Sequence, residues 1–139
     1  MSAFPAYIIH ADDDPLIHGL VERALGDAPG LKLRFCDSGR ELIDMLTKNP
    51  PELVLLDLSM PGMDGLGALR ELHKNQAFRN VLIILMTGHV GLKMQEDFKA
   101  LGIIGIIHKP FSPGMLPERI RYLWHLHHTG EDIEIHSRM

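Results

Sequence analysis

Two short apolar runs constrain the fold of this chain more than any other feature. Leu53–Leu56 and Val81–Met86 contain no polar residue and no alternation of polar with apolar positions. Such a strand is covered by helices on both faces of its sheet, because neither face is polar enough to contact water. The two runs therefore predict central strands of a parallel sheet in an α/β domain.

Segments with helical periodicity separate these runs from three further candidate strands. Strands are expected at Tyr7–Ala11, Leu31–Cys36, Leu53–Leu56, Val81–Met86 and Ile103–His108. Helices are expected from Pro15 to Leu25, from Asp37 or Ser38 to the stop at Asn49-Pro50-Pro51, from Asp64-Gly65 through Leu72, from near Leu92 to Leu101, and from about Leu116 to Gly130. This alternation predicts a doubly wound, flavodoxin-like α/β fold with a five-stranded parallel sheet in the order 2-1-3-4-5. We assign residues 6–128 to this domain and residues 129–139 to a C-terminal tail or the start of a linker.

Composition narrows the possible functions. The chain has 14 Lys and Arg residues against 18 Asp and Glu residues, so we expect no direct nucleic-acid binding by this chain. Its single cysteine, Cys36, fits a reducing compartment. No apolar run approaches the ~20 residues that span a bilayer, and Met1–Ala6 lacks the features of a secretory signal. We therefore expect a cytoplasmic protein with no membrane partner.

Polar side chains follow four of the predicted strands, where each strand ends. They are Asp12, Asp13 and Asp14 after the first strand, Asp57 after the third, Thr87 after the fourth and Lys109 after the fifth. Ligands of open α/β sheets bind beyond the carboxyl ends of the strands, so these side chains are expected to form one site. Asp14 precedes Pro15, and we interpret it as the cap of the first helix.

The charges at this site predict a metal ion. Two carboxylates about 4 Å apart repel each other by about 4 kcal/mol at an effective dielectric constant of 20. Lys109 supplies one positive charge and Mg²⁺ would supply two, which together balance Asp12, Asp13 and Asp57. A carboxylate in such surroundings can act as a nucleophile and accept a phosphoryl group.

Four motifs carry a resemblance to a known family. They are Ala11-Asp12-Asp13-Asp14-Pro15, the stretch from Asp57 to Gly65, Met86-Thr87-Gly88 and Lys109-Pro110-Phe111. With this spacing, the chain closely resembles the receiver domain of bacterial two-component response regulators from about Ala6 to Leu126.

The resemblance implies a role for each site residue. Asp57 would accept a phosphoryl group from a phosphohistidine on a histidine kinase or a histidine phosphotransfer protein. Asp12, Asp13, Asp57 and the backbone carbonyl of Ser59 would hold Mg²⁺. Thr87 and Lys109 would contact the phosphoryl group, and Lys109-Pro110 would have a cis peptide bond. The domain would then switch binding to a downstream output protein or domain, with self-phosphorylation and slow autodephosphorylation as its only catalytic activities.

The residue at the switch position departs from the family pattern. Ile106 stands where receiver domains usually carry Tyr or Phe, the aromatic residue of their conformational switch. This departure leaves an alternative, in which the chain is a pseudo-receiver that binds partners without being phosphorylated. The presence of every phosphorylation residue favours the phosphoacceptor.

Overall fold

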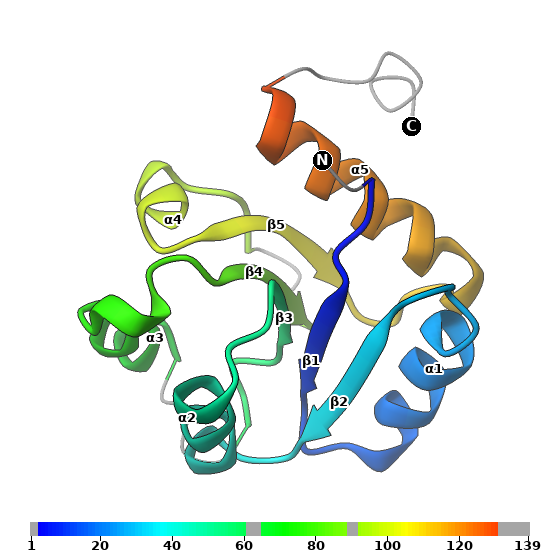
Figure 1. The fold of residues 1–139 in the computed structure, drawn as a ribbon, viewed down its shortest axis with the longest axis horizontal. Coiled ribbons are helices and arrows are strands. Elements are labelled where there is room, and N and C mark those ends of the chain that lie inside the picture. The colour runs from blue at the N-terminus through cyan, green and yellow to red at the C-terminus, as the bar shows by residue number, and fades with distance from the viewer. Residues whose placement is uncertain (1–2, 61–64, 89–91, 131–139) are drawn as a thin grey trace.

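The computed structural model describes residues 3–60, 65–88 and 92–130 of the chain. Its strands form one parallel sheet in the order β2-β1-β3-β4-β5 (Figure 1). They are β1 (Tyr7–Ala11), β2 (Lys32–Cys36), β3 (Leu53–Leu56), β4 (Leu82–Thr87) and β5 (Ile103–His108). The predicted flavodoxin-like fold and strand order are therefore confirmed, and each strand lies within one residue of its predicted bounds.

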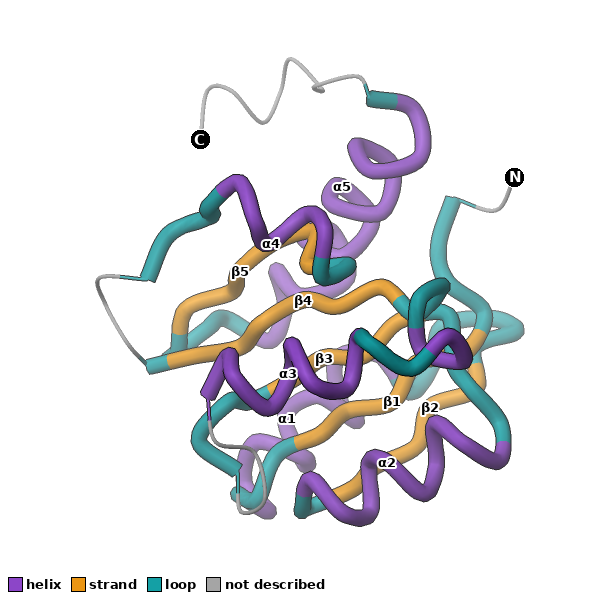
Figure 2. Tube along the Cα trace, turned by 90° about the vertical axis from the view of Figure 1, so that its left-hand side faces the viewer, coloured by secondary structure: helices purple, strands orange, loops and turns teal. Residues whose placement is uncertain are grey.

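Helices cover both faces of the sheet, as Figure 2 shows. They are α1 (Pro15–Leu25), α2 (Gly39–Lys48), α3 (Gly65–His73), α4 (Glu96–Ala100) and α5 (Leu116–Thr129), with short 3₁₀ turns at Gln76–Phe78 and Pro113–Met115. α1 and α5 pack on one face, and α2, α3 and α4 pack on the other. Among the described residues, no helix is long and apolar enough to cross a membrane.

Burial on both faces explains the two apolar runs. Successive residues of a strand point to opposite faces of the sheet. Accordingly, Leu55 contributes to the core beneath α1 and α5, whereas Leu56 contributes to the core beneath the other three helices. Both leucines are 1% exposed or less.

Polar caps define the ends of several helices. The Asp14 side chain accepts a hydrogen bond from the backbone N–H of Leu16, which confirms its predicted capping role. Ser38 caps α2 in the same way. α5 ends at Gly130, which has a φ of 71°, a conformation that favours glycine.

The fourth helix is shorter than predicted. We expected it to begin near Leu92, but it begins at Glu96 and residues 92–95 are not helical. Gln95 is extended, with φ −123° and ψ 159°, and the Leu92 carbonyl faces the side chain of His108 at 3.1 Å. The Leu92 carbonyl therefore contacts a side chain of β5 instead of accepting a hydrogen bond within a helix. Helical periodicity alone does not reveal such a tertiary contact.

Two predicted features fall outside the described residues. One is the Pro61–Asp64 part of the motif after β3, with the expected helix start at Asp64, and the other is residues 131–139 of the tail. The domain boundary at residue 128 stays a prediction.

Candidate functional site

The carboxyl ends of β3, β4 and β5 border an open hollow of about 620 Å³. Its lining residues are Asp57, Leu58, Ser59, Thr87, Gly88, Leu92 and Lys109. Asp57, Thr87 and Lys109 thus line the same hollow, as expected from their positions at the ends of three parallel strands.

Three carboxylates converge beside this hollow. One oxygen each of Asp12, Asp13 and Asp57 lies within 4.8 Å of the other two. Asp12 is completely buried and Asp57 is 6% exposed, whereas Asp13 is exposed to solvent. This set suits Mg²⁺, a hard cation that prefers oxygen ligands and keeps several water molecules, because Asp13 leaves the site open to water.

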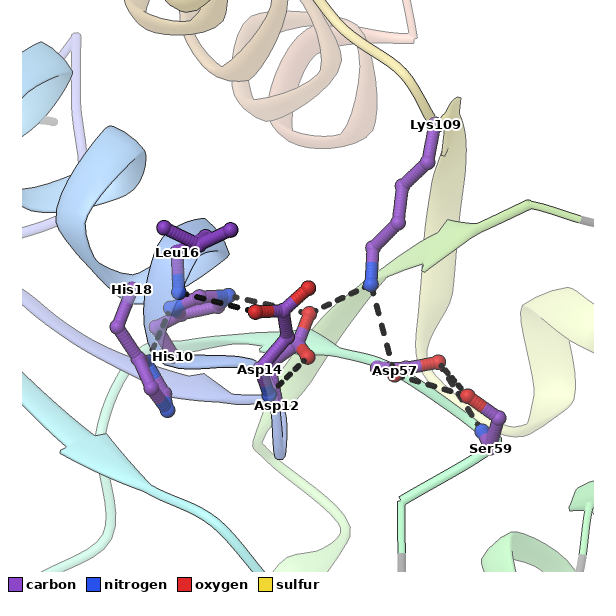
Figure 3. A network of polar contacts seen from close by, with 8 residues as sticks. All are labelled: His10, Asp12, Asp14, Leu16, His18, Asp57, Ser59 and Lys109. Atoms are coloured by element: carbon purple, nitrogen blue, oxygen red, sulfur yellow. Dashed lines mark hydrogen bonds and ion pairs between the residues drawn. The ribbon is translucent and has the colours of Figure 1, made fainter.

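Lys109 joins two of these carboxylates (Figure 3). Its Nζ lies 2.6 Å from Asp12 Oδ2 and 3.4 Å from Asp57 Oδ2. The Lys109-Pro110 peptide bond is cis, as predicted, and the Lys109 N–H donates to the Thr87 carbonyl at 2.6 Å. The lysine is therefore held between β4 and the two acids.

The ion pair shifts the pKa of both partners. Burial alone would raise the pKa of Asp12, but His10, Lys109 and the Asp14 backbone N–H hold that pKa well below its usual range. Burial alone would lower the pKa of Lys109, but the bond to Asp12 and the charges of both acids raise it. Both groups are therefore charged at neutral pH.

Ser59 makes contacts to Asp57 that sequence reasoning missed. Its backbone N–H donates to Asp57 Oδ1 at 3.0 Å, and its hydroxyl lies 2.8 and 2.9 Å from the two carboxylate oxygens. The family resemblance implies a role only for the Ser59 backbone carbonyl, as a metal ligand, and that role stays a prediction. A serine two residues after an acid often bonds back to it, and this local pattern could have signalled the contact.

A pair of histidines behind Asp12 is the second feature that sequence reasoning missed. His10 is completely buried, and its Nδ1 lies 2.9 Å from Nδ1 of His18 on α1 (Figure 3). Its Nε2 lies 3.8 Å from Asp12 Oδ2. The available signal was the spacing, because residues two apart along a strand point to the same face and Asp12 directly follows β1.

Ile106, at the atypical switch position, is 7% exposed and belongs to the core beneath α2, α3 and α4. Its carbonyl accepts a hydrogen bond from the Arg119 guanidinium of α5 at 3.3 Å. Beside it lies a groove of about 230 Å³, which Phe111, Met115 and Arg119 also line.

The fold and the site together define a flavodoxin-like domain with an acidic cluster and a lysine at the carboxyl ends of its strands. The sequence pattern of the response regulator receiver domain matches residues 8–121. The chain therefore belongs to the response regulator receiver family.

Individual relatives agree with this assignment. The chain is 37% identical over 101 residues to the DNA-binding transcriptional regulator NtrC of Klebsiella pneumoniae, covering 73% of this chain and 21% of that protein. It is 38% identical over 75 residues to sporulation initiation phosphotransferase F of Bacillus subtilis, covering 54% of this chain and 59% of that protein. The chain thus spans about a fifth of the first of these relatives and under two thirds of the second.

Solved structures match the fold over nearly their whole length. The chemotaxis response regulator CheY4 of Vibrio cholerae aligns with a TM-score of 0.72 and 24% identity, covering 84% of this chain and 97% of that one. A CheY-like receiver domain protein of Methanospirillum hungatei aligns with a TM-score of 0.71 and 29% identity, covering 88% and 98%.

Replacing Lys109 is expected to destabilise the domain when Mg²⁺ is absent. In Lys109→Met the buried Asp12 loses its cation, so the free energy of unfolding should fall by about 2 kcal/mol. Urea denaturation with and without Mg²⁺ measures this effect, and Mg²⁺ should stabilise the variant more than the wild type. Lys48→Met, on an exposed position of α2, is the control. Equal stability of Lys109→Met and wild type would contradict a stabilising role for the ion pair between Lys109 and Asp12.

Proposed function

We propose that the domain is a phosphoacceptor of a two-component signalling system, with Asp57 as the residue that receives the phosphoryl group. The observation that carries this proposal is the position of Lys109, with Nζ 3.4 Å from Asp57 Oδ2, beside three converging carboxylates. A lone buried acid needs no such surroundings, whereas a phosphoryl acceptor needs positive charge next to it.

In the transfer, a carboxylate oxygen of Asp57 attacks the phosphorus of a phosphohistidine on a histidine kinase or a histidine phosphotransfer protein. The phosphorus–nitrogen bond breaks, and its electron pair returns to the imidazole of the donor, which takes up a proton. Lys109 and Thr87 line the same hollow. In this proposal the Lys109 ammonium and the Thr87 hydroxyl contact the oxygens of the phosphoryl group. The Ser59 hydroxyl must release at least one Asp57 oxygen, because it contacts both.

Asp12, Asp13, Asp57 and the Ser59 carbonyl are the proposed ligands of Mg²⁺. When bound, the ion would offset negative charge on the carboxylates and on the phosphoryl oxygens. The domain would act in the cytoplasm and pass its state to a downstream output protein or domain. Beyond its own phosphorylation and slow dephosphorylation it would catalyse no reaction.

Intact-mass measurement tests the proposal. The protein is incubated with phosphoramidate, a small donor with a phosphorus–nitrogen bond, either with Mg²⁺ or with EDTA. We expect a mass gain of one phosphoryl group with Mg²⁺ and little gain with EDTA. If the folded protein gains no phosphoryl group under either condition, the alternative of a pseudo-receiver holds.

Ile106 is expected to weaken the link between phosphorylation and α5. In the family, an aromatic ring at this position turns inward as the strand-4 hydroxyl moves, but a β-branched side chain has few χ1 rotamers and no ring to turn. Adding beryllofluoride, which mimics the phosphoryl group, should shift amide NMR signals strongly at Asp57, Thr87 and Gly88 and only modestly in α5.

Substitutions at Ile106 sharpen this test. Ile106→Tyr should enlarge the α5 shifts, because the neighbouring groove offers space for a ring, while Ile106→Val should leave them small. Large shifts throughout Leu116–Trp124 in the wild type would show that another route carries the signal.

A further inference from the structure

The side chain of His10 is a buried polar group to which the proposed transfer assigns no task. It lies on β1, two residues before Asp12, and is completely shielded from solvent. Nδ1 has a partner in His18, whereas Nε2 has no hydrogen-bond partner among the described residues. The atom that Nε2 faces is Asp12 Oδ2, at 3.8 Å.

The short contact between the two histidines restricts their tautomers. At 2.9 Å, one Nδ1 must donate a proton and the other must accept it. If His10 donated, its Nε2 would carry a lone pair pointing at the Asp12 carboxylate, which is repulsive. If His18 donates, the Nε2 of His10 carries the proton and presents an N–H to that carboxylate. The second arrangement is the favourable one.

Packing holds both rings in this relation. The rings of His10 and His18 pack edge to face, with centroids 4.6 Å apart, and each also contacts the ring of Phe35 on β2. His10 is completely buried, which disfavours a charged imidazolium, so its ring carries one proton. The tautomer of His10 then depends on the donor from His18.

We propose that His10 is a positioning residue for Asp12. Its Nε2–H faces Asp12 Oδ2, and the Nδ1–H of His18 keeps the proton on that nitrogen. This inference rests on the proposed function, because it concerns how Asp12 is held when Asp57 becomes phosphorylated.

The reason for a second donor lies in the geometry of Lys109. The same oxygen, Asp12 Oδ2, accepts from Lys109 at 2.6 Å, and Nζ is 3.4 Å from Asp57. A phosphoryl group on Asp57 would attract Nζ away from Asp12. Without another donor, the completely buried oxygen would lose its hydrogen bond, which is costly. A small movement that shortens the 3.8 Å contact lets His10 take over.

Histidine ¹⁵N NMR tests the tautomers in the wild-type protein. Two-bond ¹H–¹⁵N correlations are recorded at about pH 8, where an unperturbed histidine is neutral. We expect the proton of His10 on Nε2 and a proton of His18 on Nδ1. A proton on Nδ1 of His10, with Nε2 bare, would overturn the proposal.

Lys109→Met tests the exchange of donors without any phosphoryl group. Removing Nζ should move the His10 Nε2 proton downfield, because its bond to Asp12 shortens. An unchanged proton shift in the folded variant would show that His10 does not replace the lysine.

Matched variants of His10 separate hydrogen bonding from packing. Gln places an amide N–H close to where Nε2 lies, and Met has a similar length but no donor. With phosphoramidate and Mg²⁺, we expect the phosphorylation rate of His10→Met to fall about tenfold and that of His10→Gln to stay within about threefold of wild type. Equal loss in both variants, or loss in neither, would contradict the positioning role.

Failure of this inference can be told apart from failure of the proposed function. If the wild type is not phosphorylated but the tautomers and the shift in Lys109→Met are as expected, the phosphoacceptor proposal fails and His10 still positions Asp12. If Asp57 is phosphorylated and His10 carries its proton on Nδ1, only the positioning role fails.

Discussion

Asp57→Asn should accept no phosphoryl group from phosphoramidate in the presence of Mg²⁺. The substitution preserves the size and shape of the side chain, and the amide oxygen can still accept from the Ser59 N–H. A neutral amide lacks the anionic carboxylate nucleophile, however, and neither its nitrogen nor its remaining oxygen attacks phosphorus effectively. The expected loss is complete within the sensitivity of intact-mass measurement, the largest effect of any substitution discussed.

The control for Asp57→Asn is the same chemical change at an exposed position. Asp44 lies on the exposed face of α2, so Asp44→Asn should be phosphorylated like the wild type. Amide NMR spectra establish that both variants are folded. Phosphorylation of Asp57→Asn at the wild-type rate would assign the acceptor to another residue, whereas a trace at a neighbouring carboxylate or hydroxyl would not.

The sheet was predictable because its central strands leave few alternatives. An apolar run such as Leu53–Leu56 can be buried only between two layers, and a chain of β–α units with right-handed crossovers then has few strand orders. The convergence of Asp12, Asp57 and Lys109 follows from the same rule, because carboxyl ends of parallel strands share one edge. These predictions needed only local sequence and general topology.

Apart from the local contact of Ser59 with Asp57, the features that were missed depend on contacts between different parts of the fold. The start of α4 depends on the contact between His108 and the Leu92 carbonyl, which joins positions 16 residues apart. The pairing of His10 with His18 depends on how α1 packs on β1. Neither contact produces a periodic pattern or a bias in composition, so no local feature of the sequence indicates it.

Removing the charge of Asp13 should change metal binding and stability in opposite directions. Asp13→Asn deletes one anionic oxygen ligand, so the affinity for Mg²⁺ should fall at least about tenfold. Without Mg²⁺, the same substitution relieves repulsion with Asp12 and Asp57, and the free energy of unfolding should rise. A purely structural defect would instead lower stability under both conditions.

Urea denaturation over a range of Mg²⁺ concentrations measures both effects together. A ligand that binds only the folded state adds RT ln(1 + [L]/Kd) to the free energy of unfolding. At a Mg²⁺ concentration far above both dissociation constants, a tenfold weaker affinity therefore reduces the gain from Mg²⁺ by about 1.4 kcal/mol. The curves of stability against Mg²⁺ for wild type and Asp13→Asn should cross, with the variant more stable at low Mg²⁺.

Asp27→Asn changes the net charge equally but lies in the turn before β2, so its curve should run parallel to that of the wild type. Parallel curves for Asp13→Asn as well would mean that Mg²⁺ binds without Asp13, because an acid outside the coordination sphere changes stability but not the dependence on the metal.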